Sequence, residues 1–148
     1  MKKVNPIPEG YHTVTPYIMV ENVKEYVAFL QKAFNGLAKS STKSANGTYL
    51  NVEMQIGTSM LMLAEARGGF KPMPMSFYMY VDEVDSSYQQ AIKNGATSLN
   101  EPGDRFYGNR DCGVIDIKGN YWFIASRIEQ LTEEEITQRI TPKIRKDS

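Results

Sequence analysis

Cysteine and histidine are almost absent from this sequence, whose 148 residues include one of each, Cys112 and His12. A single cysteine cannot form an internal disulfide, and a conventional zinc site needs several histidine or cysteine ligands. The sequence therefore excludes a disulfide-stabilised domain and a zinc finger. Because disulfides are typical of oxidising compartments, we expect the protein to be cytoplasmic.

An excess of charge of one sign is also missing, because 17 Lys and Arg balance 17 Asp and Glu. Binding to nucleic acid or to an anionic membrane surface needs clustered basic charge. No apolar run is long enough to cross a bilayer, and no apolar segment follows the lysines at the N-terminus as in a signal peptide. We therefore expect a globular protein that binds neither nucleic acid nor membrane.

An internal repeat is present instead, at a shift of 61 residues. The identical pairs at this shift include Tyr17 with Tyr78, Val20 with Val81, Val23 with Val84 and Lys32 with Lys93. In each half a short apolar strand, at 14–20 and at 76–81, precedes an amphipathic helix with apolar residues at helical spacing. Asn35-Gly36 and Asn94-Gly95 are predicted to end the two helices, with glycine in the left-handed position.

Further strands follow each predicted helix. Apolar and polar residues alternate over 49–56, and apolar segments follow at 60–63, 113–116 and 121–124. Residues 66–74 form a linker rich in glycine and proline. Thr132 and Glu135 form a capping box for a C-terminal helix, and Pro142 is predicted to lie just beyond its end. The sequence predicts an α+β fold of two modules, 10–66 and 75–128, which form one domain and precede a helix and tail over 132–148.

Three segments of this repeat, YHTVTPY (11–17), FYGNR (106–110) and GNYWFIA (119–125), stand in a duplicated βαβββ pattern. With that pattern they resemble the vicinal oxygen chelate superfamily, which includes glyoxalase I, bleomycin-resistance proteins and extradiol dioxygenases, and within it a small glyoxalase-related branch. The resemblance covers roughly residues 10–139. It implies that the two modules form a cup-shaped mixed sheet and that the protein is a homodimer with a small-molecule ligand.

The resemblance also indicates where a metal ion would be bound. In the metalloenzymes of the superfamily, each module places one ligand on its first strand and one on its last. These places correspond to Thr15, Met62, Ser76 and Phe123. None of the four is an imidazole or a carboxylate, the ligands that a divalent ion needs in such a site. We therefore expect no metal and no other cofactor.

Alternation along the strands predicts which side chains line the cup. If Val14, Ile18 and Val20 pack under the first helix, their neighbours face the cavity. The lining is then aromatic and rich in methionine, with a few polar groups, which suits a flat or amphipathic small molecule. The predicted ligand-binding residues are Tyr17, Asn51, Glu53, Met62, Tyr78, Tyr121 and Phe123, with Arg110, in a loop at the rim, as an anchor for an anionic ligand. The alternative is that these side chains fill the cup as core.

Glu53 is the one carboxylate predicted inside the cup, and it is the candidate catalytic residue. It can anchor a cationic ligand or, with a raised pKa, act as a base; alternatively it is an exposed residue or pairs with a cation at a dimer interface. His12 precedes the first strand, which argues against a catalytic role, and Cys112 is expected to pack in the core.

Two main functions remain open at this point. The first is a metal-free binding protein that holds an aromatic or amphipathic ligand in the cup. The second is a glyoxalase-related lyase or isomerase that uses Glu53 or a tyrosine without metal, although no residue stands out to stabilise an oxyanion. A third reading, an effector-sensing partner of a regulatory protein, needs a separate DNA-binding chain. Whether the protein is an enzyme is left undecided.

Overall fold

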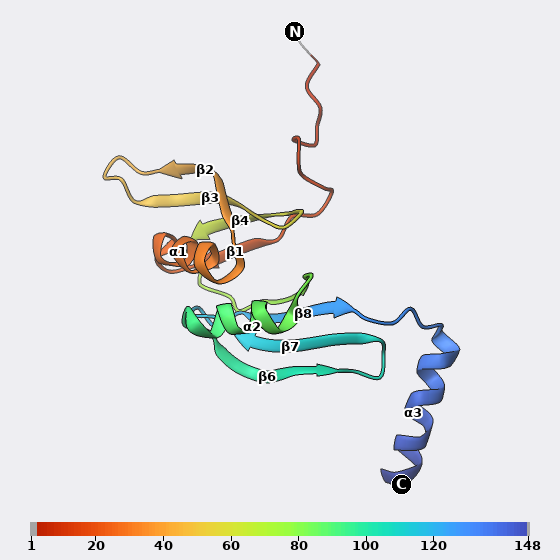
Figure 1. Ribbon diagram of the computed structural model, residues 1–148. Coiled ribbons are helices and arrows are strands. Elements are labelled where there is room, and N and C mark those ends of the chain that lie inside the picture. The colour runs from red at the N-terminus through yellow and green to blue at the C-terminus, as the bar shows by residue number, and fades with distance from the viewer. Residues whose placement is uncertain (1–2, 148) are drawn as a thin grey trace. The chain divides into compact units, whose positions relative to one another are not determined.

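The computed structural model describes residues 3–147, with side chains described up to residue 140. The chain divides into two compact units, one before Ser76 and one from Ser76 onward. In the described residues each unit contains a four-stranded mixed sheet with a helix against it (Figure 1). None of the helices within these residues is both long and apolar enough to span a bilayer. The predicted α+β class is confirmed.

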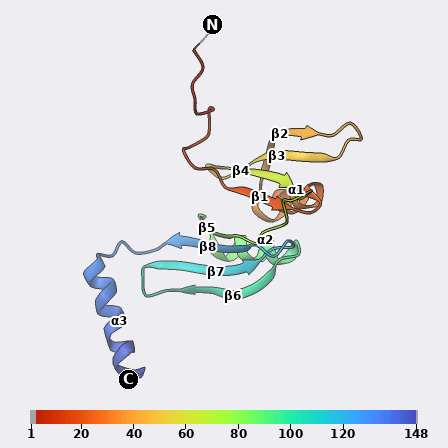
Figure 2. The same ribbon diagram turned by 180° about the vertical axis from the view of Figure 1, so that it is seen from behind.

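The first unit contains the elements β1, α1, β2, β3 and β4 in chain order. Their bounds are Tyr17–Val20, Val23–Phe34, Leu37–Lys43, Tyr49–Ile56 and Ser59–Glu65. The strand order in the sheet is β1-β4-β3-β2, with β1 parallel to β4 and the other neighbours antiparallel. Figure 2 shows from behind that β2 and β3 run side by side as a hairpin.

The second unit repeats this topology. Its elements β5, α2, β6, β7 and β8 span Ser76–Tyr80, Val84–Lys93, Thr97–Asp104, Asn109–Ile115 and Tyr121–Arg127, and α3 follows at Glu133–Asp147. The strand order is β5-β8-β7-β6, again with the first strand parallel to the last. The repeat extends to the register, because Tyr17 lies opposite Met62 and Tyr78 lies opposite Phe123, both at the shift of 61 residues.

The core of the first unit lies between α1 and one face of its sheet. Ile18, Leu30 and Leu63 are fully buried, and a longer set of side chains is nearly so: Val23, Tyr26, Phe29, Val52 and Met54. Glu65 fixes the start of α1, since its carboxylate accepts hydrogen bonds from the backbone N–H groups of Asn22 (2.8 Å) and Val23 (3.2 Å). Because strand side chains alternate, the neighbours of these core residues lie on the face away from α1.

Several sequence predictions are corrected by the structure. The first strand begins at Tyr17, and Val14 is 81% exposed rather than packed under α1. Pro16 precedes the strand and has no N–H to pair. The left-handed residue at the end of α1 is Asn35 (φ 57°), while Gly36 is required because a Cβ there would lie 2.7 Å from Met54 Cε. In the second unit Gly95 does have positive φ, as expected.

The C-terminal helix begins as predicted but does not end where predicted. Thr132 Oγ1 accepts a hydrogen bond from the Glu135 N–H at 3.2 Å, which is one half of the capping box. The helix α3 then continues to Asp147, so the expected end before Pro142 is wrong. Proline inside a helix removes one backbone hydrogen bond, and here it does so without ending the helix.

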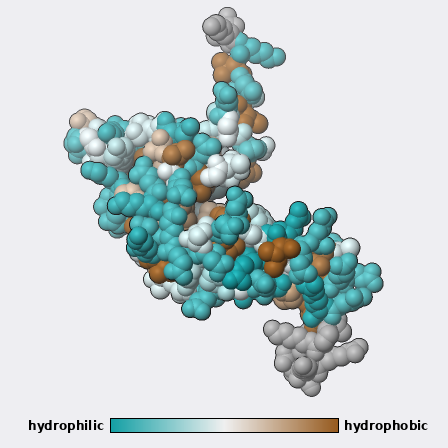
Figure 3. Space-filling model, in the orientation of Figure 1, coloured by the Kyte–Doolittle hydropathy of each residue, from teal (hydrophilic) through white to brown (hydrophobic). Residues whose placement is uncertain are grey.

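The described part of the face shown in Figure 3 is mainly hydrophilic, with hydrophobic side chains in small separate spots. Large apolar side chains that are individually exposed include Phe70 (68%) and Tyr80 (67%). Scattered exposed apolar residues are normal on protein surfaces and do not by themselves mark a binding site.

Asp116 organises the turn between β7 and β8. It is 5% exposed, and its carboxylate accepts hydrogen bonds from the N–H groups of Lys118 (2.8 Å) and Asn120 (3.0 Å) and from the Trp122 indole (2.8 Å). Three donors from both sides of the turn therefore converge on one buried carboxylate.

We expect Asp116→Ala to lower the free energy of unfolding of the second unit by about 2 to 4 kcal/mol, because it leaves buried donors without partners. Trp122 is the only tryptophan, so its fluorescence during urea unfolding reports this unit directly. The exposed Asp82 provides the control, and Asp82→Ala should change stability by less than about 0.5 kcal/mol. Equal effects of the two substitutions would contradict the role given to Asp116.

Candidate functional site

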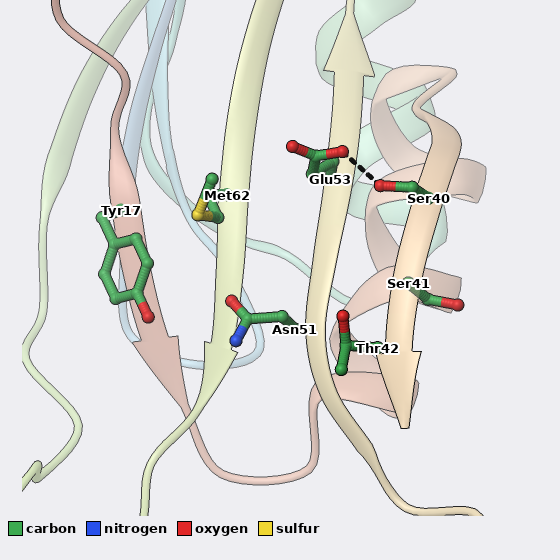
Figure 4. A pocket seen from close by; sticks show the side chains of 7 residues that line it. All are labelled: Tyr17, Ser40, Ser41, Thr42, Asn51, Glu53 and Met62. Carbon is green, nitrogen blue, oxygen red and sulfur yellow. Dashed lines mark hydrogen bonds between the residues drawn. The ribbon is translucent and has the colours of Figure 1, made fainter. Parts of the chain in front are cut away.

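A hollow of about 380 Å³ lies on the face of the first sheet that points away from α1. All four strands contribute to its lining, as Figure 4 shows. The lining residues are Tyr17 from β1, Met62 from β4, Asn51 and Glu53 from β3, and Ser40, Ser41 and Thr42 from β2. The structure therefore brings together four of the predicted ligand-binding residues, Tyr17, Asn51, Glu53 and Met62.

Strand register places the main lining residues in two rows across the sheet. Tyr17 lies opposite Met62, Met62 opposite Glu53, and Glu53 opposite Ser40. In the next row Asn51 lies between Ala64 and Thr42. One end of the hollow thus presents an aromatic ring and a thioether, and the other presents hydroxyl, amide and carboxylate groups.

Glu53 is held by two hydroxyl donors. Ser40 Oγ and Tyr11 Oη each donate a hydrogen bond to one of its carboxylate oxygens. These bonds, that from Ser40 first, lower the pKa of Glu53 below its ordinary value. The base with a raised pKa that we considered from the sequence is therefore wrong, and Glu53 is a carboxylate that stays ionised at neutral pH.

Tyr11 was not among the predicted site residues. It lies before β1, outside any strand, so alternation along the strands gave no sign of it, although it belongs to the segment 11–17. Burial, together with the hydrogen bond and the charge of Glu53, raises the pKa of Tyr11 to about 12. The phenol therefore stays protonated and acts as a donor to Glu53.

Asn51 contributes a buried acceptor with no partner. Within the described residues its Oδ1 atom is shielded from solvent and accepts no hydrogen bond. Figure 4 shows its amide group directed from β3 toward β4, on the face that carries the hollow. Because buried polar atoms are nearly always paired, an orphan acceptor at a hollow indicates a place where a ligand donor fits.

The second sheet carries an aromatic face instead of a hollow of this kind. Tyr78, Tyr121 and Phe123 share the face away from α2, as their alternation predicted. The Tyr78 ring centroid lies 6.4 Å from that of Phe123 and 5.5 Å from that of Tyr80. Tyr78 and Tyr121 are 48% and 40% exposed, so they are not closed into the core of the unit.

A hydrogen-bonded cluster around Asp111 lies beside this aromatic face. The carboxylate is 5% exposed and accepts hydrogen bonds from Arg105 Nε (2.7 Å), Tyr78 Oη (3.2 Å) and Tyr107 Oη. Burial first, and then Asp111, raises the pKa of Tyr107, and burial likewise raises the pKa of Tyr78. Sequence reasoning missed Arg105 and Tyr107, whose contact with Asp111 depends on the turn between β6 and β7.

Arg110 does not occupy a loop at the rim, as we had expected. It belongs to β7, next to Asp111, and its side chain is directed to the opposite face, where it pairs with Asp85 of α2 (2.7 Å) and with Asp104 (2.9 Å). Two carboxylates thus already engage the guanidinium. The structure does not bring Arg110 together with the residues of either sheet face.

The chemistry of the side chains does not fit a divalent metal ion. Over the described residues no three His, Cys, Asp or Glu side chains come together in a group that could hold one. The strand positions that correspond to metal ligands offer two hydroxyls, a thioether and a phenyl ring. Cys112 is fully buried, and desolvation raises the pKa of its thiol to about 11, which agrees with the expected packing role.

We expect Tyr11→Phe to raise the pKa of Glu53 toward its ordinary value of 4.5, because one of the two donors to the carboxylate is lost. A ¹³C NMR titration of the Glu53 carboxyl carbon measures this. Since the folded-state pKa is lowered, Glu53 contributes stability at higher pH that is lost as the pH falls through that pKa, and the variant should lose less. Tyr17→Phe is the control and should leave the pKa unchanged; an unchanged value in Tyr11→Phe would refute the assignment.

No protein-family model matches this sequence. The chain is similar to a protein of Mycobacterium bovis known only as uncharacterised, with 23% identity over 134 residues, 83% of this chain and 88% of the relative. Among solved structures it is similar to TioX from Micromonospora sp. ML1, with a TM-score of 0.67 and 17% identity over 82% of this chain and 100% of that one.

A glyoxalase/bleomycin resistance protein/dioxygenase from Nocardioides is also similar in structure. The TM-score is 0.60 and the identity 14%, over 82% of this chain and 87% of that one. At this level of identity the likeness concerns the fold. The chain thus has the α+β fold of the glyoxalase/bleomycin-resistance/dioxygenase proteins, as the resemblance in its sequence indicated.

Proposed function

We propose that this chain is a metal-free small-molecule-binding protein that holds an aromatic or amphipathic ligand in the hollow of its first sheet. The observation that supports this most is the buried, unpaired Oδ1 of Asn51 at the hollow. A hydrogen-bond donor from a ligand would satisfy this atom, whereas an empty hollow leaves its desolvation uncompensated.

The shape and chemistry of the hollow support the same proposal. Its volume of about 380 Å³ lies within the range of small-molecule pockets. Tyr17 and Met62 supply a surface for a flat apolar group, since aromatic rings and thioethers contact such groups well. Asn51, Glu53 and Ser40 lie across the same rows and would fix its orientation by hydrogen bonds.

The metal-free lyase or isomerase is supported less well. A general base works best when its pKa lies near the operating pH, and the pKa of Glu53 is lowered instead. The raised pKa values of Tyr11, Tyr78 and Tyr107 keep these phenols protonated, so they are donors rather than bases. We therefore prefer binding to catalysis.

Other expectations from the sequence stay predictions. A contribution of Tyr78, Tyr121 and Phe123 to ligand binding would use their aromatic face for stacking. Homodimer formation and a cytoplasmic location are likewise proposed and await measurement, the first by sedimentation of the purified chain.

A thermal-shift screen tests the proposed function. Flat aromatic antibiotics and bleomycin-type glycopeptides should raise the melting temperature, because a ligand that binds only the folded state stabilises it. Zinc, nickel and iron ions should not. A rise with these ions and none with any aromatic compound would contradict the proposal.

Thr42→Trp then localises the binding, because an indole at this position fills the hollow. We expect at least a tenfold loss of affinity for a compound found in the screen, measured by calorimetry. Thr97→Trp makes the same change at an exposed residue of β6 and should leave the affinity unchanged. Equal affinities of the two variants would place the ligand elsewhere.

A further inference from the structure

The two sheets have corresponding positions that can be compared one by one. Tyr17 opposite Met62 in the first unit corresponds to Tyr78 opposite Phe123 in the second. Asn51 lies opposite Ala64, and Asp111 lies opposite Ala125 at the same shift of 61 residues, so Asn51 and Asp111 are equivalent. Each is the polar acceptor that its central strand directs to the face away from the helix.

In the second unit the chain itself fills this acceptor with a cation. Arg105 donates from Nε to Asp111 Oδ1 at 2.7 Å and from Nη2 to the Asp111 carbonyl at 3.1 Å. Space for the guanidinium exists because Gly103 lies opposite Asp111, and a Cβ at Gly103 would meet Arg105 Nη1 at 3.0 Å. The side chain of Arg105 thus covers the strand next to Asp111.

In the first unit no side chain takes the place of Arg105. Thr42 lies opposite Asn51, and no lysine or arginine is among the residues that line the hollow. Glu53, two residues from Asn51 on the same strand face, forms no ion pair with a lysine or arginine among the described side chains. The hollow therefore holds one negative charge and one unpaired acceptor, and no cation of the protein's own.

We infer that the ligand class of the hollow is an aromatic molecule with a cationic nitrogen group, which takes the place that Arg105 occupies in the second unit. This deepens the proposed function and rests on it. The nitrogen donates to Asn51 Oδ1 and interacts with Glu53, while the aromatic body lies against Tyr17 and Met62. The acceptor groups of Asn51 and Glu53 project from residues about 7 Å apart along β3, a span that one charged head group can bridge.

The existing partners of Glu53 leave room for this interaction. A carboxylate has about four acceptor positions, and Tyr11 and Ser40 use one each. Because both partners are neutral hydroxyls, the negative charge itself is not compensated. The lowered pKa of Glu53 ensures that this charge is present at neutral pH. An anionic ligand would meet repulsion from Glu53 and find no cation at the hollow.

Three probes of matched size test the inference with the full-length protein. They are 2-naphthylmethylamine, a cation at neutral pH, 2-naphthylmethanol, which is neutral, and 2-naphthoate, an anion. Dissociation constants come from ¹H–¹⁵N NMR titration, which detects weak binding and reports the Asn51 side-chain amide. We expect the amine to bind about tenfold more tightly than the alcohol, as a charge-assisted hydrogen bond allows, and the naphthoate to bind most weakly.

Two variants separate the contributions of the acceptors. Glu53→Gln should abolish the preference for the amine over the alcohol, and Asn51→Leu should weaken both about equally, because both donate a hydrogen bond. Glu101→Gln on β6 makes the same charge change at an exposed residue and should alter neither constant. Thermal unfolding of each variant confirms that it is folded, and the three probes on the unmodified chain need no variant.

The outcomes distinguish the two proposals. If the alcohol or the naphthoate binds at the hollow as tightly as the amine, the ligand class is wrong and the binding function stands. If no probe shifts the resonances of Asn51, Glu53 or Met62, the hollow does not bind aromatic molecules and both proposals fail. A preference for the amine that persists in Glu53→Gln also overturns the inference.

Discussion

The pairing register of β3 with β4 is the constraint on which the candidate site depends. A shift by one residue would turn Asn51 and Glu53 onto the face covered by α1 and bring Val52 into solvent. The register is held because Val52, Met54 and Leu63 are almost fully buried against α1. The burial of apolar side chains on one face therefore fixes the polar arrangement on the other. The site follows from the core without any interaction of its own to align it.

Duplication of one module gives two sheets with the same register and different chemistry. In the second, Asp111 is saturated by Arg105, Tyr107 and Tyr78, so its acceptor positions are taken by the chain. In the first, the equivalent Asn51 has a buried oxygen without a partner and faces a hollow. A saturated cluster stabilises its unit, whereas an unsatisfied acceptor costs free energy that a ligand can return. This difference, rather than the fold, is why we place binding in the first unit.

Much of this fold could be predicted because apolar periodicity and the repeat agree with each other. The parity of β1, β3 and β4 correctly placed Tyr17, Asn51, Glu53 and Met62 on one face. By contrast, β2 is exposed along its whole length and has no apolar period, so nothing in it identified a strand. The sign of the pKa shift of Glu53 depends on Ser40 and on Tyr11, 42 residues away, and local sequence does not encode such contacts. The site was therefore predictable in its strand residues and not in the groups that tune them.

The most direct test of the account is a contact between a bound aromatic molecule and Met62. With ¹³C-methyl methionine, an isotope-filtered NOE spectrum of the complex with 2-naphthylmethylamine shows which of the 8 methionines touch the ring. The account predicts NOEs from the ring protons to the Met62 methyl group, because Met62 lies between Tyr17 and Glu53 in the lining. NOEs to other methionines with none to Met62 would contradict it and place the ligand elsewhere.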